Sequence, residues 1–130
     1  MVLALQGADH LVVVFDNLSR GFAAAVRTAP LVVGNLRSPA ALDGCFAAHR
    51  IDLVLRFAAL AYVGESVIEP ELHYLNNVVV NHNLLAAMRR QGVKHLVFSF
   101  TCATYGKPDH VPFTEIHPQR PINPIVVVRR

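Results

Sequence analysis

Four short apolar runs constrain this fold most, because each suits a strand and is too short for a stable helix. They lie at residues 10–15, 31–33, 51–57 and 93–98. The first is apolar without alternation, which is typical of a strand buried on both faces of a parallel sheet. Helix-like segments separate the runs, and strands that alternate with helices imply right-handed βαβ units. The sequence therefore predicts one α/β domain with a parallel sheet.

The segments between the runs carry helix start and stop signals. Ser38 can cap a helix over residues 39–49, with proline at its first position. The longest predicted helix opens at Pro70, continues to residue 90 and ends at Gly92. The pattern further predicts a short helix over 1–6 closed by Gly7, a turn and weak helix over 18–27, a loop at 64–66, irregular chain from 107 onward, and a strand or helix stub at 126–128.

Composition narrows the classes of function. Hydrophobic residues make up 53% of the 130 residues and charged residues 16%. This composition is apolar for a free-standing domain, and we interpret the excess as surface that partners would cover. The net charge of +3 is spread without a basic stripe, which argues against nucleic acid, and no apolar run reaches the roughly 20 residues of a membrane helix. Cys45 and Cys102 have no disulfide or metal spacing, and the seven histidines show no metal pattern. We expect buried thiols, a cytoplasmic protein and no metal.

Small or polar residues follow the apolar runs, where ligands bind in open α/β sheets. Asp16 ends the first run, and Ser99, Thr101 and Thr104 follow the last one. A carboxylate at such a strand tip can bind the hydroxyls of a ribose, although a solvated strand end is the alternative. Thr101 is either a site hydroxyl or a group satisfied within a turn. The residues alone leave both alternatives open.

Six motifs occur in order along the chain: FDN at 15–17, GNLR at 34–37, RFAALAYVGESV at 56–67, NN at 76–77, VFSFTCATYG at 97–106 and NP at 123–124. Together they resemble the UDP-glucose 4-epimerase group of the NAD-dependent epimerase/dehydratase family, which are extended short-chain dehydrogenases. Dehydratase relatives carry an Asp-Glu pair after the catalytic threonine. Cys102 and Ala103 stand there in this chain, which favours an epimerase.

The resemblance implies a Rossmann fold, a bound NAD and interconversion of UDP-glucose and UDP-galactose through a 4-keto intermediate in galactose metabolism. Asp16 would bind the adenine ribose, Thr101 would be catalytic, and a UDP-sugar would be the substrate. A homodimer is one candidate assembly. The full set of cofactor-binding residues that the resemblance implies is Asp16, Asn17, Asn35, Leu36, Phe57, Ala58, Ala59, Asn76 and Ser99.

Departures from the family pattern are equally informative. The glycine-rich fingerprint and the first strand that carries it are missing, and Asn35 stands where the family commonly has aspartate. Ile125 and Arg129 occupy the positions of the family's catalytic tyrosine and lysine. We therefore predict that residues 1–130 form an incomplete NAD-binding Rossmann domain, truncated at both ends, without a substrate domain and inactive alone. Without the first strand, its two neighbours either close up on each other or leave a gap.

Three alternatives remain open at this level. The start site could be misassigned, with the glycine fingerprint encoded upstream. The intact protein could be another NAD-dependent nucleotide-sugar epimerase or dehydratase. The chain could also be a non-catalytic nucleotide-binding or interaction module. Calorimetry with NAD separates these alternatives, because a chain that shows no binding at millimolar NAD serves neither as an enzyme nor as a cofactor sensor.

Overall fold

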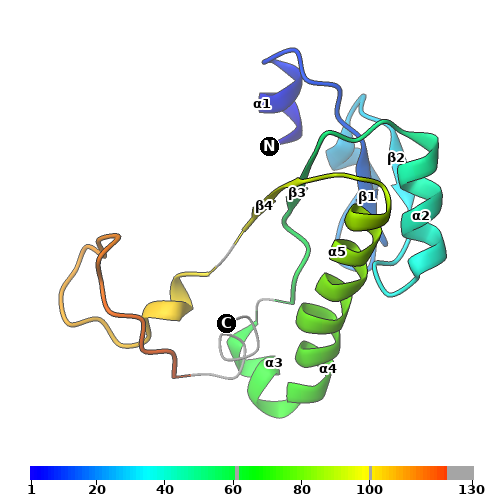
Figure 1. The fold of residues 1–130 in the computed structure, drawn as a ribbon. Helices are drawn as coiled ribbons and strands as arrows, with labels where there is room; N and C mark the ends of the chain where they lie inside the picture. Colours follow the sequence, from blue (N-terminus) through cyan, green and yellow to red (C-terminus); the bar gives the residue numbers. More distant parts are fainter. Residues whose placement is uncertain (61, 100, 123–130) are drawn as a thin grey trace. The chain divides into compact units, whose positions relative to one another are not determined.

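The computed structural model describes residues 1–60, 62–99 and 101–122 of the chain (Figure 1). These residues divide into two compact units. The first comprises Met1–Leu53 and Asn83–His95, and the second comprises Val54–His82 and the residues from Leu96 onward. Residues 125–129, which include both predicted departures from the catalytic pair, lie outside the described residues.

The first unit contains a two-stranded parallel sheet. Strand β1 (Val14–Asp16) pairs with β2 (Leu31–Val33), and Asp16 lies opposite Val33. The remaining elements of this unit are α1 (Val2–Gln6), a 3-10 turn (Ala23–Val26), α2 (Pro39–Ala48) and most of α5 (Val80–Arg90). Strand β2 has the predicted bounds. Strand β1 is shorter than predicted, because only three residues find partners on β2.

Helix α2 begins and ends near the predicted residues. Ser38 Oγ accepts a hydrogen bond from the Ala41 N–H at 3.2 Å, and Pro39 occupies the first turn, so both predicted start signals operate. Leu42 is the buried residue of this helix. The part of α5 that belongs to this unit buries Leu84, Ala87 and Met88, and these residues supply much of the core of the unit.

The second unit contains the other sheet and the rest of the helices. Strand β3 (Leu53–Arg56) pairs with β4 (His95–Phe98), and both strands begin at the boundary with the first unit. Helices α3 (Val63–Ile68) and α4 (Pro70–Tyr74) follow β3. A 3-10 turn (Cys102–Tyr105) follows β4, and the chain is irregular from there to residue 122, as predicted.

Among the described residues, no ladder joins β1–β2 to β3–β4. In the Rossmann order, β1 and β3 would flank the first strand. Of the two outcomes predicted for the loss of that strand, the closing up of these two strands into one ladder is not seen among the described residues. The α/β class and the partial Rossmann character are confirmed.

Two predictions about helices need correction. The loop predicted at residues 64–66 is wrong, because these residues lie within α3, where Glu65 in the first turn complements the helix dipole. The long helix is confirmed from Pro70 to Arg90 (Figure 1), but residues Leu75–Val79 form a π-helical turn inside it. Gly92 ends this helix with φ of +73°, a left-handed conformation that favours glycine.

Candidate functional site

Four of the predicted cofactor-binding residues meet at one edge of the first unit. Strands β1 and β2 are parallel, so their carboxyl ends lie side by side. Just beyond the strands, the Gly34 N–H donates to the Asp16 carbonyl at 3.0 Å. The structure therefore brings residues 16–17 next to residues 35–36, which the chain separates by a 3-10 turn and a strand.

One oxygen of the Asp16 carboxylate is hydrogen-bonded within its own loop, and the other is available to a ligand. Its Oδ1 accepts from the Leu18 N–H at 2.6 Å, whereas Oδ2 has no hydrogen bond to any described residue. A Cβ at Gly21 would lie 3.2 Å from Oδ1, so glycine there lets the chain pass close to the carboxylate. Asn17 caps the same loop, since its Oδ1 accepts from the Ser19 N–H and hydroxyl. A half-buried carboxylate with an available oxygen suits a pair of vicinal ribose hydroxyls.

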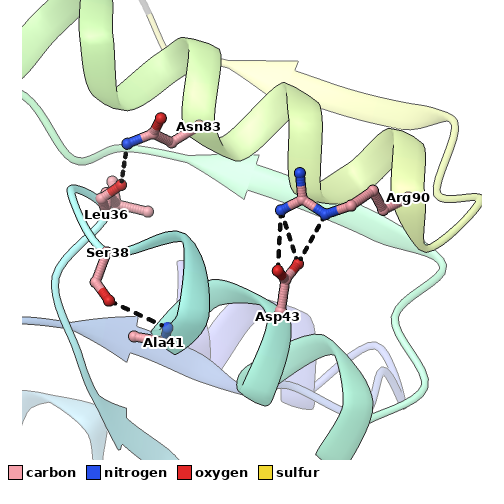
Figure 2. A network of polar contacts seen from close by, with 6 residues as sticks. All are labelled: Leu36, Ser38, Ala41, Asp43, Asn83 and Arg90. Carbon is pink, nitrogen blue, oxygen red and sulfur yellow. Dashed lines mark hydrogen bonds and ion pairs between the residues drawn. The ribbon is translucent and has the colours of Figure 1, made fainter.

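The loop after β2 is held by helix α5 (Figure 2). Asn83 Nδ2 donates to the Leu36 carbonyl at 3.2 Å, as Figure 2 shows. It also donates to the Arg37 carbonyl at 3.4 Å. One to two turns further along α5, Arg90 forms a bidentate ion pair with Asp43 of α2, with N–O distances of 2.8 and 3.1 Å for Nη2. Both contacts join residues 46 to 47 positions apart. The loop and the start of α2 are thus fixed against one helix.

A second group of predicted residues lies in the second unit, where residues 57–59 follow β3. Phe57 and Ala58 are exposed and Ala59 is half-buried. The next residue, Leu60, is clamped by Asn77, whose Oδ1 accepts from the Leu60 N–H and whose Nδ2 donates to the Leu60 carbonyl, both at 3.0 Å. Asn77 is fully buried. This clamp fixes the end of the segment that the resemblance assigns to the cofactor.

The two adjacent asparagines of the π-helical turn differ in burial. A π turn inserts an extra residue into a helix and changes which side chains face the core. Asn77 is fully buried, whereas the predicted cofactor residue Asn76 is half-buried. Asn77 therefore faces the core and not solvent. Its signal in the sequence is the pair of poor helix formers in the middle of a long helix.

Thr101 has the role of a turn cap in this structure. Its Oγ1 accepts from the Ala103 N–H at 3.2 Å, at the start of the 3-10 turn. A hydroxyl that accepts this bond still has a proton to donate. Ser99 lies beside the end of β3, because its N–H donates to the Arg56 carbonyl at 3.0 Å. The two alternatives for Thr101, turn cap and site hydroxyl, are therefore compatible.

Polar groups buried in the second unit stabilise its elements. His73 is fully buried on α4, and its Nε2 lies 3.1 Å from Glu65 Oε2 on α3. This pair joins the two helices, which gives the glutamate of the GESV motif a structural role. Arg56 is also buried, with its guanidinium carbon 4.8 Å from the centre of the Phe98 ring, a cation–π contact across β3 and β4. None of these contacts was predicted from the sequence.

The two cysteines differ in exposure. Cys102 is exposed, so the prediction of a buried thiol is wrong for it, because it lies on the 3-10 turn after β4. Cys45 is half-buried in α2, and burial raises the pKa of its thiol.

In the described part of the chain, no three His, Cys, Asp or Glu side chains come together in a way that could hold a metal ion. No helix within the same residues is long and apolar enough to cross a bilayer.

Asp16, Asn17, Asn35 and Leu36 thus belong to the first unit, and Phe57, Ala58, Ala59, Asn76, Ser99 and Thr101 to the second. An α/β fold with small and polar residues beyond its strand ends is typical of nucleotide-binding proteins. Residues 1–127 match the NAD dependent epimerase/dehydratase family, and the chain belongs to that family. This match confirms the predicted family and its cofactor, NAD.

Within the family, the chain is similar in sequence and structure to UDP-glucose 4-epimerases. It is 47% identical over 122 residues to the enzyme of Rhizobium leguminosarum bv. trifolii, covering 94% of this chain and 37% of that protein. It is 44% identical over 123 residues to that of Halalkalibacterium halodurans, covering 95% and 37%. The crystal structure of UDP-glucose 4-epimerase from Brucella ovis in complex with NAD superposes with a TM-score of 0.92 at 40% identity, covering 98% and 39%. The chain therefore spans well under half the length of these relatives.

Proposed function

We propose that this chain forms part of the NAD-binding domain of a UDP-sugar 4-epimerase. The intact enzyme would interconvert UDP-glucose and UDP-galactose through a 4-keto intermediate, a reaction of galactose metabolism. The observation that carries the proposal is the edge of the first sheet, where Asp16 offers a carboxylate oxygen beside the loop at residues 35–36. The family match supports the same cofactor.

Each predicted residue has a role in this proposal. Asp16 binds the adenine ribose hydroxyls and Asn17 lies beside it, while Asn35 and Leu36 border the adenine. Residues 57–59 line the phosphates and the nicotinamide ribose, and Asn76 and Ser99 face the cofactor. Thr101 donates its hydroxyl proton to the reacting oxygen of the sugar. NAD, when bound, supplies the acceptor for the hydride from C4.

We further propose that the chain alone has no turnover. Isoleucine at position 125 cannot transfer a proton, and Arg129 replaces a lysine that would lower the pKa of the family's tyrosine. The chain spans only 37% of the length of the UDP-glucose 4-epimerases of Rhizobium leguminosarum bv. trifolii and Halalkalibacterium halodurans. The intact protein is proposed to be a cytoplasmic homodimer. Its two cysteines, which are free thiols, support a reducing compartment, and exposed Val67 and Ile68 on α3 offer apolar surface for a partner.

Calorimetric titration with NAD tests the cofactor role. We expect binding by the full chain at millimolar NAD or below. Asp16→Asn should weaken it about tenfold or more, because hydrogen bonds to a charged group contribute about 1.5–3 kcal/mol. The matched control is Asp52→Asn, an identical charge change on a carboxylate that is 85% exposed. This control should leave NAD affinity within about twofold.

Two results would contradict the proposal. The cofactor role fails if the folded chain shows no binding at millimolar NAD, or if the two aspartate variants bind NAD equally. The absence of turnover is tested separately by incubating the purified chain with NAD and UDP-glucose. Appearance of UDP-galactose would show that Ile125 and Arg129 do not abolish catalysis.

A further inference from the structure

The backbone of Leu18 has a conformation that leucine rarely adopts. Its φ is +56°, in the left-handed region that glycine, asparagine and aspartate occupy more readily. Asp9 and Arg27 are the other residues besides glycine with a positive φ in the described part of the chain. An unfavourable backbone conformation persists only where the surrounding contacts fix it, and such conformations cluster at ligand sites. Leu18 lies two residues after Asp16.

Two consecutive N–H groups account for the conformation of Leu18. The Leu18 N–H donates to Asp16 Oδ1 at 2.6 Å, and the Ser19 N–H donates to Asn17 Oδ1 at 3.0 Å. Each contact closes an Asx-turn, in which a side-chain oxygen accepts from the N–H two residues later. In the second turn, Leu18 takes the place of the third residue of a β-turn, which has a positive φ in type II turns. Both turns can form together because Leu18 is left-handed.

The first of these turns determines which oxygen of Asp16 a ligand meets. Oδ1 is engaged by the Leu18 N–H, whereas Oδ2 has no hydrogen bond to any described residue. Gly21 confines the carboxylate on another side, since a Cβ there would lie 3.2 Å from Oδ1 and 3.4 Å from Oδ2. The carboxylate is therefore held in one orientation before a ligand binds, and binding does not have to order it.

We infer that Leu18 is a positioning residue for the ribose of the bound nucleotide. Its left-handed backbone, and not its side chain, holds Asp16 so that Oδ2 accepts from a ribose hydroxyl. This inference rests on the proposed function, in which Asp16 binds the adenine ribose. That role follows from the position of the carboxylate at a strand tip as well as from its free oxygen. With a negative φ at residue 18, the two turns would not form together, the carboxylate could rotate, and the selection for a ribose hydroxyl would weaken.

Paired calorimetric titrations of the full chain with AMP and 2′-deoxy-AMP measure the contact with the ribose. The two nucleotides differ by one hydroxyl group, so the ratio of their affinities reports that contact. We expect the native chain to bind AMP about tenfold or more tightly, the effect of one hydrogen bond to a charged group. Asp16→Ala removes the acceptor and should bring the ratio close to one. An unfolded fraction of any variant lowers both affinities equally and cancels in the ratio.

Two substitutions at position 18 separate the role of the backbone from that of the side chain. Leu18→Ile keeps the N–H and an isomeric side chain, but a β-branched residue strongly disfavours a positive φ. It should lower the ratio of AMP to 2′-deoxy-AMP affinity by about threefold or more. Leu18→Gly also keeps the N–H, and because glycine adopts a positive φ freely, it should retain the native ratio. A side chain that contacts the nucleotide would give the opposite order, with glycine the more harmful substitution.

Arg27→Gly is the matched control for these substitutions. It places glycine at another left-handed residue of the same unit, with φ of +59°, that has no hydrogen bond to Asp16. The loss of its positive charge acts on both nucleotides alike, so the ratio of the two affinities should stay at the native value.

The outcomes distinguish this inference from the proposed function. If the native chain binds neither nucleotide, the cofactor role fails and the inference fails with it. If Asp16→Ala removes the selection for the ribose hydroxyl whereas Leu18→Ile retains it, the cofactor role stands and the inference is overturned. The inference is also overturned if the native chain binds the two nucleotides equally, if Asp16→Ala leaves the ratio unchanged, or if Leu18→Gly loses as much selection as Leu18→Ile.

Discussion

The clamp between Asn77 and Leu60 predicts a large loss of stability when the Asn77 amide is removed. Asn77→Ala deletes two hydrogen bonds of 3.0 Å from a fully buried side chain and leaves a backbone N–H and carbonyl without their partner. Each such loss costs about 1–3 kcal/mol. Leu60 is half-buried, so water recovers part of this cost, and alanine regains about 0.5 kcal/mol of helix propensity. We expect the free energy of unfolding to fall by about 2–3 kcal/mol.

Asn76→Ala is the matched control for this clamp. The residue type is the same, the position is adjacent on the same π-helical turn, and the half-buried side chain of Asn76 has no hydrogen bond to a described residue. The gain in helix propensity should be similar at the two positions. The control should therefore be neutral or slightly stabilising, and the difference between the two variants isolates the two hydrogen bonds to Leu60.

Urea unfolding, monitored by tyrosine fluorescence, measures the stability of the unit that contains the clamp. The chain has no tryptophan and three tyrosines, and all three lie in the same unit as the clamp: Tyr62, Tyr74 and Tyr105. Circular dichroism follows both units together, so the two signals report whether the loss is confined to one of them. If the two alanine variants differ by less than about 0.5 kcal/mol, the clamp does not stabilise the loop and the reasoning from its geometry is refuted.

Three further perturbations have clear expected outcomes. Arg90→Gln removes the bidentate pair with Asp43, and because those side chains are 43% and 39% exposed, urea unfolding should show a loss of at most about 1 kcal/mol that shrinks in high salt. Cys102 should react faster with a thiol reagent than Cys45, whose raised pKa leaves less thiolate near pH 8.5. The Cys45 rate should therefore continue to increase to a higher pH than that of a free cysteine, and equal pH profiles would contradict this. Gly92→Ala should cost about 1–2 kcal/mol from strain alone, since its φ is +73° and no atom lies within 4 Å of the added Cβ.

Local signals in the sequence were sufficient for some elements and not for others. Strand β2 and helix α2 were predicted almost to the residue, because an apolar run, a serine cap and a proline act within a few positions. The short helix α1 and the long helix ended by Gly92 followed from the same kind of signal. Helix α3 was missed, because its glycine and serine resemble a loop and its buried link, Glu65 to His73, depends on the helix that follows.

The candidate site was likewise predictable only in part. Asp16 at the tip of β1 follows from the strand pattern alone, and the structure places it beside Asn35 as parallel pairing requires. The contacts that hold the site in place were not predictable locally. Asn83 reaches a loop 46 to 47 residues away, and Asn77 reaches back 17 residues to Leu60. Only the tertiary fold brings residues so far apart in the sequence into contact.

The shortness of the two sheets affects how the chain behaves in concentrated solution. With only two strands in each described sheet, all four strands are edge strands, and each has one side without a partner strand among the described residues. Apolar side chains on these strands are also accessible, with Val33 63%, Leu53 47% and Val97 50% exposed. Edges of this kind pair readily with other chains and promote aggregation. Titrations should therefore be made with dilute protein and excess ligand, with turbidity followed alongside, so that strand addition between molecules is not mistaken for a lack of nucleotide binding.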